Sequence, residues 1–451
     1  MRTSLHRRAG IALLALVLAA GCTVTKVEGE DADAAREGST PEEQADAGFP
    51  DAITQGLTDD TITIGAALID AATLQAQGID IEAIDPQALL DAWIATANEG
   101  GGLGGRQVEM VFQPYLPISD TEAETACTAL TEDQEVFAVI GQFSGDTSLC
   151  ITETHALPYV GLYGLSPERQ ARSKGPFFAV EMADDRQREA SIAAMVEAGE
   201  MEGNVGLYYQ AKDQAIVDDV VKPALDEAGI EPVVETVLDD VGGGATGGTD
   251  QAAVDQAIDT IVERHRSADV DVFLNVSNFA DPMGGFQRKG WTPERILVTT
   301  QQALSEDVIA ETEIDPAILA QTLVVAPYVP SKDELLADDD VVACIDEYNA
   351  TDPEEPIDVD TATRTELAGL ANLCTAWTLF RRGVEDAGDD LTAQSWAEGV
   401  AAIGDDHLPG FPYSSLGGGK QSAGDTIGVY AYDPDAGFFV AEGDPIEADA
   451  G

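Results

Sequence analysis

Basic residues are scarce in this chain. Lys and Arg account for 23 of its 451 residues, against 83 Asp and Glu, and the formal net charge is −60. Nucleic-acid phosphates are bound by clustered Lys and Arg, so this composition excludes a nucleic acid as a partner. Acidic residues are spread along the whole chain, and such an excess of one sign destabilises a compact state by self-repulsion. We therefore hypothesise an adaptation to high salt, where the Debye length falls to about 3 Å at 1 M.

Histidines and long apolar runs are also few. Apart from His6, the histidines are His155, His265 and His407, and their spacing is not that of a zinc site, so no metal or other cofactor is expected. The apolar run Ile11–Ala20 is too short to cross a bilayer as a helix, which takes about 20 residues. Hydrophobic residues still make up 44% of the chain, which is enough for folded cores and excludes global disorder.

The N-terminus indicates export. Several arginines precede the apolar run, and residues 1–21 together read as a signal peptide. The segment Leu18–Cys22 resembles a bacterial lipobox, in which the cysteine is acylated, although Ala19 stands where that pattern usually has Leu. Ordinary cleavage near Gly21 is the alternative. We expect lipidation at Cys22 and an extracytoplasmic protein that is lipid-anchored to the cell membrane.

Four cysteines remain after Cys22. Their even number in an oxidising compartment favours disulfides over the alternative, four buried free thiols. Cys127 and Cys150 fall on successive helical patterns, as do Cys344 and Cys374, which makes 127–150 and 344–374 the natural pairings. Connectivity does not follow from sequence alone, so these pairings are a prediction.

The stretch Asp91–Tyr115 reads as the end of a helix, a glycine turn and a strand. Its glycines, between Gly100 and Gly105, stop the helix and supply positive φ values. Apolar residues then alternate from Val108 to Phe112, as in a half-buried strand. The run AxANEGGGLGGRxVE within this stretch resembles the first helix-to-strand corner of the branched-chain amino-acid binding proteins, the type I periplasmic binding family.

Strands and helices alternate along the rest of the chain, which predicts an α/β fold with doubly wound sheets. The expected strands are 61–66, 108–112, 136–140, 158–162, 205–209, 233–237, 270–276, 296–300, 323–328 and 427–432. The expected helices include 216–228, 254–262, 341–348 and 365–388, and one that begins with a capping box at Ser119–Glu122. Pro223 should kink or interrupt the first of these.

The family resemblance implies two Rossmann-like lobes joined by three crossover segments. We place the crossovers near Val180, Ala326 and Leu416. Lobe 1 would then comprise residues 59–180 and 327–415, lobe 2 residues 181–326 and 416–445, and residues 22–58 an acidic flexible tether.

Several segments partly match the motifs of nucleotide-binding or hydrolytic enzymes, but their context or spacing does not fit. The glycines at 100, 102 and 105 follow a helix and precede a strand, the reverse of a dinucleotide-binding loop. Those at 242, 244 and 247 lie among Asp239, Asp240 and Asp250, which would repel a pyrophosphate. The segment Gly141–Gly145 lacks the spacing of a nucleophile elbow. We therefore expect that this protein is not an enzyme.

A ligand site is expected at the carboxyl ends of the strands, where loops and helix N-termini converge. In lobe 1 these loops are Ser144–Ser148 and Tyr163–Ser166. The alternative is that Ser144, Thr147 and Ser148 only cap the following helix.

The resemblance implies that hydroxyls of these two loops, with an acid and aromatics of lobe 2, hold an amino acid. This chain departs from that pattern: Asp146 stands among the hydroxyls, Leu165 replaces a Thr and Gln301 replaces the acid. Asp146 would then be the counter-charge of an ammonium group, or the ligand carries none. The candidate ligand-binding residues are Ser144, Asp146, Thr147, Ser148, Tyr163, Gly164, Leu165, Gln214, Asn278, Phe279, Gln301 and Tyr328.

These features predict a monomeric solute-binding lipoprotein of an ABC importer, which closes two lobes on a small polar ligand and presents it to permease subunits in the membrane. An amino acid, an amide, a urea-like compound and an organic acid all remain open as ligands. The alternatives are a ligand-sensing receptor component on the same fold and, third, a secreted hydrolase.

Overall fold

The computed structural model describes residues 54–76, 84–117, 119–239, 251–277, 280–304, 309, 313–417 and 419–448. The predicted signal peptide and Cys22 lie outside this part of the chain, as do Asn278 and Phe279. No helix within it is long and apolar enough to cross a membrane.

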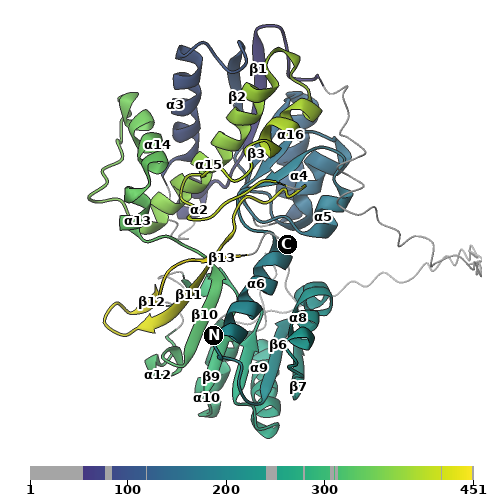
Figure 1. Ribbon diagram of the computed structural model, residues 1–451, viewed down its shortest axis with the longest axis vertical. Coiled ribbons are helices and arrows are strands. Elements are labelled where there is room, and N and C mark those ends of the chain that lie inside the picture. Colours follow the sequence, from purple (N-terminus) through teal and green to yellow (C-terminus); the bar gives the residue numbers. More distant parts are fainter. Residues whose placement is uncertain are drawn as a thin grey trace, which may run out of the picture. The chain divides into compact units, whose positions relative to one another are not determined.

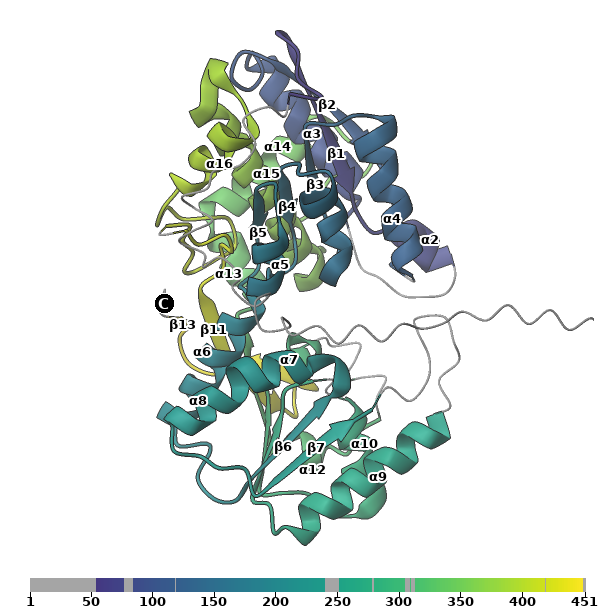
Figure 2. The same cartoon turned by 90° about the vertical axis from the view of Figure 1, so that its right-hand side faces the viewer.

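The first sheet has five parallel strands in the order β2-β1-β3-β4-β5. Figure 1 labels β1, β2 and β3 of this sheet, and Figure 2 labels all five strands. Their bounds are β1 Thr61–Ala67, β2 Gln107–Phe112, β3 Ala138–Gly141, β4 Tyr159–Gly161 and β5 Phe177–Ala179. All residues of β3, β4 and β5 are buried, as expected for parallel strands covered on both faces.

Helices cover both faces of this sheet. One apolar cluster joins Ile64, Ile140 and Phe178 to α3 (Pro86–Glu99), α14 (Asp339–Ala350), α15 (Arg364–Ala387) and α16 (Ala393–Ala401). The other cluster joins Ala67, Val139 and Phe177 to α4 (Asp120–Thr128). Figure 2 shows α3 and α4 on opposite sides of β1. Smaller helices are α2 (Ala71–Ala76), α5 (Pro167–Arg172) and α13 (Lys332–Ala337).

The corner between α3 and β2 forms as predicted. The helix ends at Glu99, and Gly101, Gly102, Gly104 and Gly105 have positive φ. The side chain of Asn98 accepts a hydrogen bond from the Val108 N–H (2.8 Å) and donates one to the Val108 carbonyl (2.9 Å), which joins the end of the helix to the strand.

The second sheet is mixed, in the order β12-β11-β10-β9-β8-β6-β7, with β13 paired to β11. The strands are β6 Val205–Gln210, β7 Val234–Leu238, β8 Val272–Asn275, β9 Arg295–Val298, β10 Thr322–Pro327, β11 Thr426–Asp433, β12 Phe438–Ala441 and β13 Ile446–Glu447. Strands β6 to β10 are parallel, whereas β11 runs antiparallel to β10 and β12.

Helices of this lobe also line two apolar clusters, one on each face of the sheet. They are α6 Asp184–Glu197, α8 Lys222–Glu227, α9 Gln251–Ser267, α10 Ala280–Lys289 and α12 Pro316–Leu319, and the short helix α7 (Gln214–Ile216) has no residue in either cluster. A π-helical segment, Val217–Val221, separates α7 from α8, and Pro223 follows it at the start of α8. The predicted interruption at Pro223 is confirmed, because proline cannot donate the backbone hydrogen bond that a continuous helix requires.

The chain passes between the two sheets three times. It leaves the first sheet after β5, returns after β10, and leaves again between α16 and β11. The predicted fold class, two doubly wound lobes with three crossovers, is confirmed.

Two local predictions need correction. Ser119 precedes α4 but makes no side-chain cap hydrogen bond, so the predicted capping box is not formed. Residues 54–58, assigned to the flexible tether, pack on lobe 1 instead: Gln55 Nε2 donates to the Val136 carbonyl (3.0 Å), and the Thr63 N–H donates to the Gly56 carbonyl (2.7 Å).

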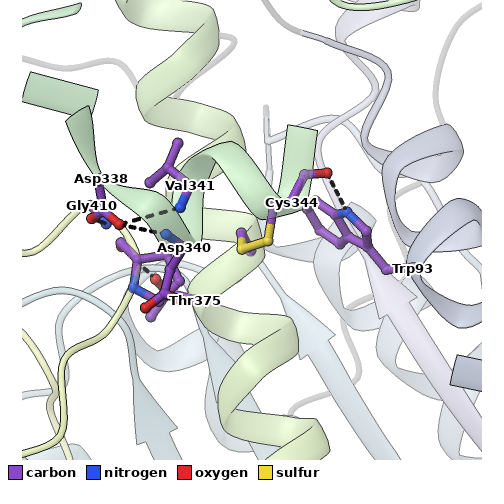
Figure 3. Close-up of a disulfide and its surroundings, with 9 residues drawn as sticks. Trp93, Asp338, Asp340, Val341, Cys344, Thr375 and Gly410 are labelled. Carbon is purple, nitrogen blue, oxygen red and sulfur yellow. Dashed lines mark hydrogen bonds between the residues drawn. A yellow bond between two sulfur atoms is a disulfide. The ribbon is translucent and has the colours of Figure 1, made fainter. Parts of the chain in front are cut away.

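Both predicted disulfides are present, Cys127–Cys150 and Cys344–Cys374. The second joins α14 to α15, and Trp93 of α3 donates its indole N–H to the carbonyl of Cys344 (2.9 Å; Figure 3). Three helices on one face of the first sheet are therefore connected at one point.

Candidate functional site

The two lobe 1 loops of the predicted site follow neighbouring strands. Strands β3 and β4 pair through Val139–Tyr159, Ile140–Val160 and Gly141–Gly161, so Ser144–Ser148 and Tyr163–Leu165 leave the same edge of the sheet. The carboxyl ends of parallel strands are where α/β folds bind ligands.

Within the first loop, hydroxyl groups bond the local backbone. Thr147 Oγ1 donates to the Ser144 carbonyl (2.6 Å), and Ser148 Oγ donates to the Gly145 carbonyl (2.9 Å). Ser148 is fully buried, whereas Ser144 is exposed and its side chain makes no cap hydrogen bond. Of the three hydroxyls, that of Ser144 is the one presented to solvent and free of a capping role.

Asp146 is held by an arginine of α5. Arg172 Nη1 lies 2.7 Å from Asp146 Oδ2, and its Nη2 lies 2.9 Å from Glu153 Oε2. The carboxylate suggested as a counter-charge for a ligand ammonium thus has a cationic partner already. The pair is largely exposed, so water competes with it.

The second loop presents one side chain and one backbone segment. Tyr163 is half-buried, and burial together with the nearby Glu181 carboxyl raises the pKa of its hydroxyl to about 12. At Gly164 a Cβ atom would overlap the carbonyl oxygen of Met182, so only glycine fits there. Leu165 is 2% exposed and packs in the apolar cluster around α4.

In lobe 2, the candidate residues that the structure describes follow three strands of one sheet. Gln214 comes after β6, Gln301 after β9 and Tyr328 after β10. Gln301 Nε2 donates to the carbonyl of Pro327 (3.3 Å), which brings Gln301 next to Tyr328. Gln214 bonds instead to Tyr209 (3.0 Å) and Asp218 (2.7 Å), on the side of β6 away from these two.

Tyr328 is held from two directions. Its hydroxyl donates to Glu334 Oε1 (2.6 Å), and its ring stacks on that of Tyr430 with centroids 6.3 Å apart. Burial, followed by the Glu334 carboxylate, raises the pKa of this hydroxyl. The ring is thereby oriented by contacts within the protein.

The start of α6 contributes polar groups that the sequence analysis did not identify. Arg188 donates to the carbonyl and to Oγ1 of Thr299 (2.9 Å to Oγ1), directly after β9. Burial lowers the pKa of its guanidinium, against the attraction of Asp184 and Asp213. The scarcity of basic residues in this chain was the one sequence signal that could have singled out Arg188. Its place at the end of β9 could not be predicted, because Thr299 lies 111 residues away.

Glu181 is the second polar residue near the strand ends, after Arg188, that the sequence analysis did not identify. It lies two residues beyond β5, where burial raises its pKa to about 7, with a further contribution from the Asp184 carboxylate and an opposing hydrogen bond from the Gly164 N–H. Asp184 itself pairs with Arg169 (3.1 Å). Within the described part of the chain no basic side chain lies within ion-pair distance of Glu181.

Two groups of potential metal ligands occur in the part of the chain that the structure describes: Cys127, Cys150 and His155, and Asp338, Asp340 and His407. The cysteines of the first form a disulfide. Asp338 caps α14 by accepting from the Asp340 and Val341 N–H groups, and also accepts from the Gly410 N–H (2.8 Å; Figure 3). These contacts account for the carboxylate, and we assign no metal to either group.

No protein-family model and no curated protein matches this chain. Solved structures do match. A type 1 periplasmic binding protein from Bordetella pertussis Tohama I has 13% sequence identity and a TM-score of 0.60, over 85% of this chain and 100% of that one. An ABC transporter substrate-binding protein from Desulfitobacterium hafniense, in complex with Leu, has 14% identity and a TM-score of 0.58 over the same shares.

A solute-binding protein of an ABC transporter from Rhodopseudomonas palustris HaA2, in complex with p-hydroxybenzoic acid, has 12% identity and a TM-score of 0.60, over 86% of this chain and 98% of that one. Each of these proteins aligns over nearly its whole length. The chain therefore has the fold of the type 1 periplasmic binding proteins.

Proposed function

We propose that the protein is an extracytoplasmic solute-binding component of an ABC importer, and not an enzyme. The observation that carries this proposal is the similarity of fold, over 98–100% of their length, to periplasmic binding proteins, two of which are named as components of ABC transporters. Polar groups at the carboxyl ends of both sheets support it, because this is where an open α/β fold binds a ligand.

The proposed ligand is small and polar. Ser144, Tyr163 and Glu181 would contact it from the first sheet and the crossover, and Gln301 and Tyr328 from the second. Asn278 and Phe279 remain candidates from the sequence. The exposed hydroxyl of Ser144 and the carboxyl of Glu181 suit a ligand with hydrogen-bond donors, such as an amino acid, an amide or a urea-like compound.

The remaining features of the proposal come from the sequence. Residues 1–21 would direct export, and Cys22 would carry the lipid anchor. The lobes would follow the boundaries given above, with residues 54–58 added to lobe 1 and β13 added to lobe 2. Lobe closure around the ligand would create the surface that permease subunits bind, with ATP hydrolysed by other chains.

A thermal-shift screen tests the proposal. The mature protein is heated with amino acids, amides, ureas and short organic acids, and a ligand at 100 times its Kd should stabilise the fold by about 2.7 kcal/mol. The variant Tyr163→Phe should bind the same ligand more weakly, whereas Tyr432→Phe, on β11 outside the proposed site, should bind it as the wild type does. If no compound shifts the melting temperature, the importer function loses its support.

Reconstitution in liposomes separates this function from a sensing role. With candidate permease and ATPase subunits, ligand uptake should depend on this protein. Ligand binding without uptake would favour a receptor component.

A further inference from the structure

Among the lysines and arginines that the structure describes, only Arg169 of α5 is buried, with 7% of its surface exposed. Its Nη2 donates to the Gly164 carbonyl (3.0 Å) and lies 3.1 Å from Asp184 Oδ2. Its Nε donates to Ser166 Oγ (3.2 Å). A buried guanidinium is costly unless it is paired and hydrogen-bonded, so these three contacts fix the position of Arg169 against the loop Tyr163–Ser166.

The backbone of Gly164 is held on both sides. Its N–H donates to the Glu181 carboxyl, and its carbonyl accepts from Arg169. A Cβ atom at this position would lie 2.2 Å from the carbonyl oxygen of Met182, so the loop lies directly against the first crossover, between β5 and α6. Because Gly164 is buried, both of its backbone groups need such partners. The orientation of the preceding residue, Tyr163, therefore depends on the crossover.

The first turn of α6 extends these contacts into lobe 2. Burial raises the pKa of the Asp184 carboxyl, and the guanidinium groups of Arg169 and Arg188 both oppose this rise by attracting the carboxylate. Arg188 in turn donates to the hydroxyl of Thr299 (2.9 Å), and Gln187 Nε2 donates to the carbonyl of the same residue (2.7 Å). Thr299 directly follows β9 and has no exposed surface.

These contacts form a continuous polar path from one lobe to the other. Its members, in order, are Gly164, Arg169, Asp184, Arg188 and Thr299. Charges alternate along it, with the carboxylate between the two guanidinium groups. Tyr163 directly precedes the first member, and Gln301 lies two positions after the last. The path thus joins candidate ligand residues of lobe 1 to those of lobe 2.

We propose that Arg169 is a positioning residue of the solute site, which couples the loop that carries Tyr163 to the strand end that carries Gln301. The inference rests on the proposed solute-binding function, since it concerns the site where the solute would bind. Coupling between two sites requires an element whose arrangement both sites bias, and the first turn of α6 contacts both strand ends. A change at the end of β9 should therefore alter the surroundings of Tyr163, provided that Arg169 is present.

Fluorine NMR of the mature protein labelled with meta-fluorotyrosine tests this coupling without any ligand. The signal of Tyr163, one of ten tyrosines, is assigned by its loss in Tyr163→Phe. Thr299→Val removes the hydroxyl that Arg188 binds and changes no charge, and it should shift the Tyr163 signal beyond its line width. Thr322→Val removes another buried hydroxyl of lobe 2, which donates within its own lobe, and should leave the signal in place.

The variant Arg169→Lys tests whether this arginine is required for the coupling. Lysine keeps the charge, but its single ammonium group cannot reproduce all the contacts of the guanidinium. In this background Thr299→Val should no longer shift the Tyr163 signal. Asp184→Asn removes the next link, at a half-exposed side chain, and should abolish the response in the same way. It decides the question if Arg169→Lys does not fold.

The variant Arg106→Lys is the matched control. Arg106 also donates to backbone carbonyls of lobe 1, at Gly388 (3.2 Å) and Asp389 (2.9 Å), but lies outside the path, so its variant should keep the response. If Thr299→Val leaves the Tyr163 signal unchanged in the wild type, or shifts it equally without Arg169, the inference is overturned, and the thermal-shift screen still decides on solute binding. If the response is as expected and no compound of that screen binds, the coupling stands and the importer function fails.

Discussion

The hydroxyl oxygen of Thr236 lies 2.7 Å from Nε2 of His265, and both residues are buried in the core of lobe 2. The imidazole ring packs on Phe273, with centroids 4.7 Å apart. Its Nδ1 atom is buried and makes no hydrogen bond within the described part of the chain. A proton on this ring would therefore be buried without an anionic partner, and burial lowers the pKa of His265 from 6.5 to about 4.

The lowered pKa of His265 predicts that the folded protein loses stability in acid. Between pH 6.5 and about 4 the unfolded chain binds a proton at residue 265 that the folded chain does not, so stability falls as pH falls through this window. The full effect is up to about 3 kcal/mol. Urea unfolding at pH 7.5 and pH 4.5 should show a smaller difference for His265→Phe than for the wild type.

The effect of Glu181 on the stability of the folded protein should depend on pH in the opposite direction. Its pKa in the folded protein is raised from 4.5 to about 7, so the folded state binds a proton more tightly than the unfolded chain. Stability is thus lost as pH rises from 4.5 to 7, by up to about 3 kcal/mol. The groups facing this carboxyl are the Gly164 N–H, Tyr163 and Asp184, and none of them is a cation.

The variant Glu181→Gln should therefore be more stable than the wild type at pH 8, and the two should converge near pH 5. Urea unfolding at both values measures this. Glu385→Gln, at an exposed position of α15, serves as the control and should leave the pH profile unchanged. A Gln variant that is less stable at pH 8 would mean that the ionised carboxylate is stabilised by the site.

The parts of the fold that were predicted correctly have local causes. The corner from α3 to β2 follows from Asn98 and the glycines after it, which act within about ten residues of one another. The buried strands β3 and β8 appear as continuous apolar runs because helices cover both of their faces. The strands β5, β12 and β13 were not predicted, since they have only three, four and two residues, too few for a strand pattern to stand out from the sequence.

The candidate site was less predictable because its partners are distant in sequence. Asp146 and Arg172 are 26 residues apart, and Arg188 and Thr299 are 111 apart. The helix α6, which carries Arg188, was missed because charged residues at its start obscure the apolar face formed by Ile192 and Met195. The direction of a loop side chain, as for Leu165 and Ser148, is likewise set by packing against other elements.

The turn between α3 and β2, which contains Gly101 and Gly102, gives a prediction on stability in which one glycine serves as the control for the other. Gly102 has φ +83°, and a Cβ atom there would overlap the carbonyl oxygen of Arg106; Gly101 has φ +108° and open space around it. Gly101→Ala should cost about 1 kcal/mol, from the positive φ alone. Gly102→Ala should cost about 2–4 kcal/mol, because steric overlap adds to the same strain. Equal losses of unfolding free energy in urea would show that the overlap is relieved by movement of the loop.

The net charge of −60 leads to a prediction on salt. Raising KCl from 0.01 to 1 M shortens the Debye length from about 30 Å to about 3 Å and should relieve repulsion among exposed carboxylates. We expect the melting temperature to rise by at least about 3 °C, which is roughly 1 kcal/mol for a lobe of this size.

A variant in which a cluster of acidic residues is neutralised distinguishes relief of charge repulsion from other effects of KCl on stability. Asp226, Glu227 and Glu231 are exposed around the end of α8, where negative charge also opposes the helix dipole. Their joint replacement by Asn, Gln and Gln should stabilise the protein in 0.01 M KCl and have little effect in 1 M KCl. If the wild-type melting temperature does not rise with KCl, or if the triple variant is equally stabilised at both concentrations, self-repulsion is not what limits stability, and the acidic surface requires an explanation other than adaptation to salt.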